Sequence, residues 1–513
     1  MKKAILCLLL ITYGYLKAQP PRTFVEIIEK TTGKLTSTQQ GFVSKEYIFP
    51  DRIHSSHVDT TLNLLTIQLR ALRNEKWLAN RGKIYVFDMP GSRVRWSKNV
   101  LYQNESYENV GPLLLKTNAS GSHLLNVETG ETVRRENTVF IHADPEFNIG
   151  IGYDITPSKS LKNLLMGINI ATGEKLWQRV VTRDYSWNDL RYLNDSTLLI
   201  VAEGLHTINI HDGSGWDYTA VTGKKDYSVT IAKNVAGVAV GLLTGAYLVS
   251  TGPDLIRDVV SNVVTKDSRL YFASRNTIAC IDAEGQVVWS TPLPEKLTSK
   301  SILFLKDDQV VMVNCGYAYK GYRKINYGKP FLATFDLSSG EETYRNYIGS
   351  GQENKYNGFT VRDSCIYFIM GQQIEKYSIA SGKMLGSTTL HNEDFSFLGD
   401  HVYEQQSDST YSSINQLHPD RVYIYTKDKK IIGLDKELKV EASKADDQAW
   451  LNYFTKYNYR FLKRNKETIV LDSRGGMVAE MGEAGKSTVV GNKLYTVLAN
   501  SIIETDVSQL FSQ

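Results

Sequence analysis

The sequence predicts an all-β fold built from repeated hairpin units, and three observations lead to this expectation. Short apolar strands run into polar turns centred on glycine along nearly the whole chain of 513 residues. The turns recur mostly at intervals of roughly 40 residues, which is the period of a four-stranded blade. Alternating apolar and polar residues mark the strands on either side of them. Together these features predict an eight-bladed β-propeller, with seven blades as the alternative and with a short helical insertion.

The repeat is clearest at Asn169–Trp177, where an asparagine turn leads through glycine into a strand that carries tryptophan. Asparagine, aspartate and glycine suit tight hairpins with positive φ angles. Tryptophan closes the copies at Trp96 and Trp289 as well, whereas other copies have diverged. The turn centres are Gly91, Gly130, Gly173, Gly213, Gly285, Gly340, Gly382, Glu437 and Gly475, and in the diverged copies Val133, Thr343 and Gly386 lie near the tryptophan position. Because these nine turns exceed the blade number of common propellers, we expect some of them to be inner hairpins or part of a shared closing blade.

The two ends of the chain have distinct patterns. Lys2 and Lys3 precede an apolar run that reaches Tyr13, and Ala18 is a small residue at a plausible cleavage point. Because the run is too short to span a bilayer comfortably, we expect residues 1–18 to be a signal peptide and 19–513 to form the propeller domain. The predicted location is therefore exported, either periplasmic or outer-membrane-associated, with secretion as the alternative. Strand-like segments near both ends of the mature chain are expected to close the fold together.

Charge and cysteine content exclude several classes of function. The formal net charge of +4 gives no reason to expect a nucleic-acid partner. Cys280, Cys315 and Cys365 are widely spaced and sit among apolar residues, so they fit neither a disulfide framework nor a zinc cluster. We expect three small buried side chains, with one bridge between neighbouring strands as the alternative.

The unit apolar–x–Asp/Asn–x–x–Thr/Ser–Gly–Glu–x–Leu–Trp, best seen at residues 167–177 and 281–289, resembles the PQQ-like, or quinoprotein-type, β-propeller repeat. The resemblance implies a blade turn and a tryptophan contact between blades. For the dehydrogenases of this type it would further imply a vicinal cysteine pair, a tryptophan platform and a bound calcium. The chain has no adjacent cysteines and no calcium loop of that kind, so we expect a non-enzymatic member without a cofactor. Some exported propellers of this resemblance act as scaffolds in outer-membrane protein assembly.

Two polar segments are considered as metal sites, and both favour a simpler interpretation. Asp212 and Asp217 flank a glycine-rich loop that is too sparse in carboxylates for calcium, so we expect a hairpin turn there. His54, His57 and Asp59 have ligand-like spacing, but the surrounding sequence favours a polar surface loop. No catalytic motif can be picked out elsewhere. We therefore expect no catalytic and no metal-binding residues.

Residues 316–329 combine tyrosines with basic side chains. Tyrosine offers a flat amphipathic face, and cations pair with acidic groups or stack on rings, so this segment could contact a peptide, a glycan or an anionic surface. The alternative is a long hairpin whose tyrosines cover its own blade. The candidate partner-contact residues are Tyr317, Tyr319, Tyr322, Arg323 and Tyr327.

An uncharged stretch, residues 234–250, interrupts the repeat. Gly237, Gly241 and Gly245 recur every four residues, and on a helix they would share one face that allows close approach of another backbone. Apolar residues at helical spacing follow Pro253. Residues 229–265 are therefore predicted to form a helical insertion that packs on the propeller, or that contacts a membrane surface or a partner.

These features predict an exported, non-catalytic propeller that binds a protein or an envelope component as a scaffold. The alternative, from a different class, is an enzyme or ligand-binding protein that uses the central shaft for a quinone or a sugar. Fold alone does not decide between them.

Overall fold

The computed structural model describes residues 26–511 except for 60–61, 74–76, 89–90, 92, 103–104, 111–112, 119–120, 156–162, 182–188, 203, 219–258, 321–322, 350–355, 391–394, 398–421, 427–430, 442–452, 455–458, 465–466, 473–475 and 484. The chain divides into two compact units. The first unit contains Met1–Gln103 and Thr455–Gln513, and the second contains Asn104–Phe454. The predicted signal peptide lies outside the described residues.

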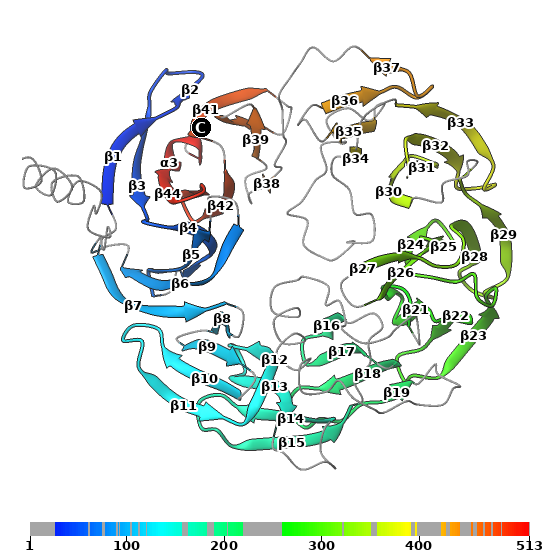
Figure 1. Cartoon of the computed structure of the whole chain (residues 1–513), viewed down its shortest axis with the longest axis horizontal. Coiled ribbons are helices and arrows are strands. Elements are labelled where there is room, and N and C mark those ends of the chain that lie inside the picture. The colour runs from blue at the N-terminus through cyan, green and yellow to red at the C-terminus, as the bar shows by residue number, and fades with distance from the viewer. Residues whose placement is uncertain are drawn as a thin grey trace, which may run out of the picture. The chain divides into compact units, whose positions relative to one another are not determined.

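The first unit contains three antiparallel sheets (Figure 1). One has the order β1 (Glu26–Thr32), β3 (Phe42–Ile48), β44 (Ser501–Asp506), β43 (Lys493–Val497) and β42 (Lys486–Val490). Another joins β2 (Lys34–Leu35), β41 (Met477–Glu483), β40 (Glu467–Leu471) and β39 (Arg460–Arg464). The third consists of β4 (Arg52–Asp59), β5 (Leu64–Arg73), β6 (Trp77–Asp88) and β7 (Arg93–Leu101), and a short helix, α3 (Ser508–Phe511), follows β44.

Strands from the two ends of the chain pair within this unit. β3 runs antiparallel to β44, with Ser44 opposite Thr505. The hydroxyls of these two residues are 2.9 Å apart in the buried centre of the sheet. Nearby, the Tyr47 hydroxyl donates to the Glu504 carboxylate at 3.1 Å. The expectation that both ends share sheets is confirmed, and the pairing removes two edges that would otherwise be exposed.

The second unit contains seven four-stranded sheets. The first three are β8 (Glu105–Val110), β9 (Leu113–Asn118), β10 (Gly121–Asn126) and β11 (Thr132–Glu136); β12 (Thr138–Asp144), β13 (Ile149–Asp154), β14 (Leu164–Asn169) and β15 (Lys175–Val180); and β16 (Asp189–Asn194), β17 (Thr197–Ala202), β18 (Gly204–Asn209) and β19 (Asp217–Tyr218). Strands in each sheet follow chain order.

The next two sheets are β20 (Val264–Lys266), β21 (Arg269–Ala273), β22 (Thr277–Ile281) and β23 (Val287–Pro292); and β24 (Ser301–Lys306), β25 (Gln309–Asn314), β28 (Phe331–Asp336) and β29 (Glu342–Tyr347). The last two are β30 (Tyr356–Arg362), β31 (Cys365–Met370), β32 (Gln373–Ser378) and β33 (Met384–Thr389); and β34 (Phe395–Phe397), β35 (Val422–Thr426), β36 (Ile431–Leu434) and β37 (Val440–Glu441). A separate hairpin joins β26 (Tyr317–Lys320) to β27 (Arg323–Asn326), and β38 (Tyr453–Phe454) ends the unit.

The fold is therefore all-β and propeller-like, as the repeat predicts. The described residues form ten sheets of four or more strands, three in the first unit and seven in the second. The prediction of eight blades, or seven, is not confirmed by this number. Each of the nine turn centres lies between the last two strands, in chain order, of one sheet, and no two of them belong to the same sheet. None of them is therefore an inner hairpin.

Successive sheets of the second unit are joined by one recurring contact. The Trp177 ring in β15 lies over the turn of the β16–β19 sheet, and its Nε1 donates to the Ile210 carbonyl at 2.7 Å. Gly213 in that turn has a φ of 73°, and a Cβ there would lie 2.7 Å from the tryptophan ring. The tryptophan contact that the repeat implies is thus present between these two sheets.

The same place is filled by several residue types along the second unit. Trp216 donates from Nε1 to the Ala283 carbonyl at 2.6 Å, and Trp289 donates to the Leu337 carbonyl at 3.1 Å. Arg134 donates to the Ala171 carbonyl at 3.0 Å, and the Tyr344 hydroxyl donates to the Ile379 carbonyl. A side-chain donor above a turn glycine is therefore the constant feature, and tryptophan is one way to supply it.

The outermost strand of many sheets begins with a β-bulge. In β15 the register pairs Gly167 with Trp177 and Ile168 with Lys175, which leaves Leu176 without an opposite residue. Val133, Val288 and Leu385 occupy the equivalent place in β11, β23 and β33. These bulged side chains are exposed. Bulges twist an edge away from regular pairing, so they protect these edges from addition of further strands.

The hydrophobic core is divided into clusters that lie between successive sheets. One cluster joins Tyr271, Cys280 and Trp289 of the β20–β23 sheet to Met312 and Phe331 of the next sheet. Cys280 and Cys315 are buried, Cys365 is partly buried, and all three are free. The expected burial is confirmed for the first two, and the alternative of a bridge between them is wrong. None of the helices in the described residues is long and apolar enough to cross a membrane.

Candidate functional site

The predicted tyrosine segment forms a two-stranded hairpin whose strands pair with each other and with no strand of the four-stranded sheets. β26 and β27 pair with each other, with Tyr317 opposite Asn326 and Tyr319 opposite Lys324. β25 and β28 pair directly across the place where the hairpin is inserted. The hairpin is therefore an addition to a sheet that is already complete without it.

The base of the hairpin is fixed by polar contacts. The Asn314 side-chain amide donates to the Leu297 and Lys329 carbonyls at 3.0 and 2.6 Å. Gly316 turns the chain with a φ of 71°, and its carbonyl accepts from the Tyr327 amide at 3.0 Å. Lys300 donates through its backbone amide to the Tyr317 carbonyl at 3.1 Å, and burial lowers the pKa of its side chain to about 8. These bonds hold both legs of the hairpin in one position.

The candidate contact residues fall into two groups. The Tyr317 ring stacks on Tyr356 of β30 with centroids 6.2 Å apart, so it packs against the neighbouring sheet, whereas the alternative interpretation expects it to cover its own blade. Tyr327 is partly buried at the other leg. Tyr319 and Arg323 lie in the strands near the tip, and their side chains, together with all of Tyr322, lie outside the described residues. Their role in partner contact stays a prediction.

Residues 229–258 of the predicted insertion, which include Gly237, Gly241 and Gly245, lie outside the described residues. The described end of the predicted insertion is not helical. Val259 forms an isolated bridge with Ser274, and Val264 opens β20. The predicted helix is therefore wrong over residues 259–265. The apolar residues there pack beside and within a sheet instead.

The polar segments take structural roles. Asp212 caps a turn by accepting from the Ser214 amide at 2.8 Å, which confirms the predicted hairpin. The Asp217 carboxylate accepts from Arg179 at 2.7 Å and lies 2.5 Å from His206 Nδ1. Burial alone would raise the pKa of Asp217, but the hydrogen bonds from His206 and Arg179 lower it to about 2.

His54 and His57 lie in strand β4, so the predicted loop is wrong, but both residues are exposed and the predicted surface position is confirmed. The His54 ring packs edge-on against Tyr102 with centroids 5.1 Å apart. Burial lowers the pKa of both histidines, and the nearby Arg70 adds to the effect at His54. Both rings therefore favour the neutral form.

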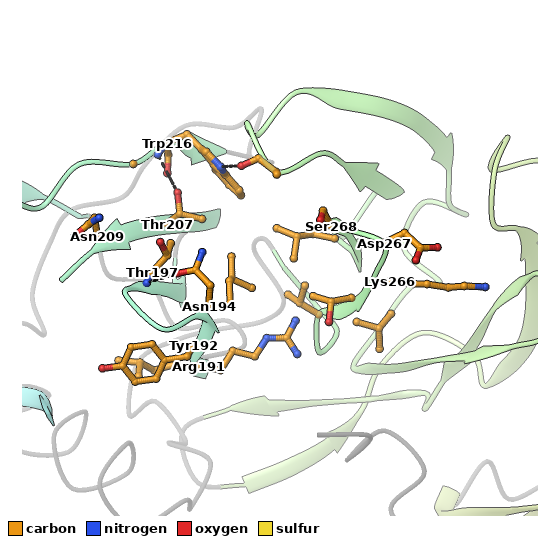
Figure 2. A pocket seen from close by; sticks show the side chains of 18 of the residues that line it. Arg191, Tyr192, Asn194, Thr197, Thr207, Asn209, Trp216, Lys266, Asp267 and Ser268 are labelled. Carbon is orange, nitrogen blue, oxygen red and sulfur yellow. Dashed lines mark hydrogen bonds between the residues drawn. The ribbon is translucent and has the colours of Figure 1, made fainter. Parts of the chain in front are cut away.

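A cavity that the sequence does not reveal lies between the β16–β19 and β20–β23 sheets of the second unit (Figure 2). Its volume is about 980 Å³, which is at the upper end for small-molecule sites. The apolar part of its lining includes Leu193, Val263, Leu270 and Leu305, of which Leu193 and Leu305 are partly exposed. The polar part of its lining includes Arg191, Asn194, Thr197, Thr207, Asn209 and Ser268. No repeat or motif marks it, because its residues come from strands and turns of three different sheets.

Strand β16 places side chains of opposite character on its two faces. Tyr192 points away from the cavity and donates its hydroxyl to the Asp144 carboxylate, with His142 Nε2 3.0 Å from the same hydroxyl. Arg191 points the other way, toward the cavity, as Figure 2 shows. Burial lowers the pKa of Arg191, and the nearby Asp189 opposes that shift. Alternation along the strand thus separates a satisfied cluster from a cation that faces the cavity.

No protein-family model matches the chain, and neither does any curated protein. Among solved structures, it is similar to BamB from Moraxella catarrhalis, with 14% identity over 78% of this chain and 95% of that chain and a TM-score of 0.34. The computationally designed protein Ika8 shares 11% identity over 76% and 95%, with a TM-score of 0.31. Hsv2p from Kluyveromyces lactis shares 8% identity over 66% and 96%, with a TM-score of 0.28. The propeller-like description rests on the sheets and turns of the chain itself.

Proposed function

We propose that this protein is a non-catalytic β-propeller that binds a protein partner as a scaffold module, with the β26–β27 hairpin as its contact element. The observation that carries the proposal is that the hairpin is additional to a complete sheet. An added element that the blade does not need for its own pairing is available for contact with another molecule. Loops and insertions on a rigid scaffold are where binding residues concentrate.

The geometry of the hairpin supports this role. Its legs are fixed by Asn314 and by the stacking of Tyr317 on Tyr356, so little conformational entropy remains to be lost at the base on binding. The sequence at the tip contains Tyr319, Tyr322 and Arg323. Tyrosine and arginine are enriched at the centres of protein interfaces. The neighbouring Lys320 and Lys324 favour a partner surface that is acidic.

The test is a quantitative pull-down from the envelope fraction of the source cell, comparing the wild type with Tyr319→Ser/Tyr322→Ser/Arg323→Ser. We expect the variant to lose its main partner by at least about tenfold, since truncating interface anchors commonly costs about 2 kcal/mol or more each. Tyr347→Ser is the matched control, because Tyr347 is 52% exposed on β29 of the same sheet but lies outside the hairpin. Equal partner recovery with wild type and hairpin variant would contradict the proposal.

Two further proposals belong to this function. Export of the chain is proposed from residues 1–18, and N-terminal sequencing of the mature protein checks it, with a start near Gln19 expected.

A second contact through residues 229–265 is proposed from the four-residue spacing of Gly237, Gly241 and Gly245. Deleting residues 230–258 and repeating the same pull-down checks this contact, and unchanged recovery from a folded protein would contradict it.

A further inference from the structure

The cavity beside β16 holds a cation whose hydrogen-bonding needs are not met by the described residues. The Arg191 Nη2 atom is shielded from solvent and makes no hydrogen bond with them. Neither does Arg191 form an ion pair with the described part of the chain, although Asp189 is close enough to act on it electrostatically. An unsatisfied N–H on a charged group is costly to bury. Arg191 is therefore suited to pair with the negative charge of a bound ligand.

Other charged residues at the cavity do not supply that partner. Figure 2 shows the side chains of Lys266 and Asp267 pointing away from Arg191. Lys266 instead lies 3.8 Å from the exposed Asp308 carboxylate. Burial raises the pKa of Asp189, which weakens its tendency to carry the balancing charge. Arg191 is therefore the principal charge that faces the cavity from the described residues.

The polar part of the lining includes two asparagine side chains whose oxygens already accept hydrogen bonds. The Asn194 side-chain oxygen accepts from the Ser196 and Thr197 amides at 3.1 and 2.9 Å. The Asn209 side-chain oxygen accepts from the His211 amide at 2.9 Å. The NH₂ groups of both asparagines can only donate, and no described residue accepts from them. This part of the lining therefore matches a ligand that is rich in acceptor atoms.

We propose that this cavity binds a small organic carboxylate, whose charged end pairs with Arg191 and whose hydrocarbon end covers the apolar wall that the partly exposed Leu193 and Leu305 form. One guanidinium balances one negative charge, and its planar fork matches the two oxygens of a carboxylate. The apolar wall would gain from covering by a hydrocarbon chain. The site is independent of the β26–β27 hairpin and of its partner.

The test uses octanoate as the probe, with calorimetric titration of the full mature chain. We expect saturable binding to the wild type and at least tenfold weaker binding to Arg191→Met. Lys266→Met is the matched control, because Lys266 is a cation of the same lining whose side chain points away from Arg191. The affinity of this variant for octanoate should stay within twofold of that of the wild type. Arg191→Lys keeps the charge but loses the fork, so several-fold weakening is expected. This second variant also keeps the test valid if Arg191→Met fails to fold.

Two further ligands separate the contributions of the two walls. Octanol has the same hydrocarbon length without the charge, and inorganic phosphate has charge without the hydrocarbon. Both should bind at least tenfold more weakly than octanoate. Absence of saturable octanoate binding, or equal octanoate binding by the wild type and Arg191→Met, would overturn the proposal. Phosphate binding as tight as octanoate binding would overturn its assignment to an organic carboxylate.

Discussion

At the scale of single residues, the ring of Trp177 packs on a turn glycine of the neighbouring sheet. Gly213 has a φ of 73°, which residues with a Cβ rarely adopt. Its missing side chain also leaves the space in which the Trp177 ring lies, since a Cβ would be 2.7 Å from that ring. Two separate requirements, one of the backbone and one of packing, thus meet at one glycine.

We predict that Gly213→Ala destabilises the protein more than Gly371→Ala does. Gly371 has a similar φ of 62°, but a Cβ there would meet nothing within 4 Å. Both substitutions incur the backbone strain of about 1–2 kcal/mol, and only the first adds overpacking of about 1–3 kcal/mol. Urea denaturation of the two variants measures the difference. Equal losses of stability would show that the ring does not press on the turn.

The sequence predicts these turns correctly but only part of the contacts above them. Asn169 and Gly173 identify a turn because the asparagine oxygen satisfies backbone amides and glycine accepts the positive φ. Tyr344 and Arg134 could not be found in the same way. Each of them lies four positions after its turn glycine, as Trp177 does after Gly173, but neither is a tryptophan, and any side chain with a suitable donor can reach the carbonyl. Thr343 and Val133, which lie near the place expected from the repeat, are therefore neighbours of the contacting residues.

At the scale of elements, one charged contact connects two adjacent sheets. The short strand β19 carries Asp217, whose carboxylate binds Arg179 of β15 and His206 of β18. Its pKa of about 2 lies below the ordinary aspartate value of 3.8. A lowered folded-state pKa means that the ionised form stabilises the fold above about pH 4, and that this contribution is lost as the pH falls toward 2.

We predict that Asp217→Asn lowers stability at pH 7 by about 1 kcal/mol, a value reduced from that of a buried charged hydrogen bond because the side chain is 46% exposed. The difference from the wild type should narrow as the pH falls from 4 toward 2. Denaturation midpoints across that range measure it. Asp308→Asn is the control, since that carboxylate is 95% exposed and should show no effect. A difference that stays constant with pH would contradict the assignment.

At the scale of the whole molecule, the turns visible in the sequence already indicate nine of the ten sheets. The expectation that some of these turns are inner hairpins is wrong. Nine turn centres are visible, and each belongs to its own sheet. The tenth sheet joins β1 and β3 to β42, β43 and β44, and it carries no glycine turn of the repeat type. The interval from Gly285 to Gly340 is long because the β26–β27 hairpin is inserted within one sheet. The cavity beside Arg191 could not be predicted, since its lining depends on how two sheets meet.

The pairing of the two chain ends makes the first unit depend on its last strand. β44 lies between β3 and β43, and its Ile502 is 1% exposed in a cluster with Tyr47 and Leu65. We predict that Ile502→Ala destabilises this unit by about 2–5 kcal/mol, the cost of a large cavity in a packed core. Limited proteolysis with mass spectrometry should then find the first new cuts within residues 26–103 or 459–511. Glu483→Ala, at the exposed end of β41 in the same unit, is the control and should leave the cleavage pattern unchanged. First cuts within residues 104–454 would show that the second unit, rather than the paired ends, is where unfolding begins.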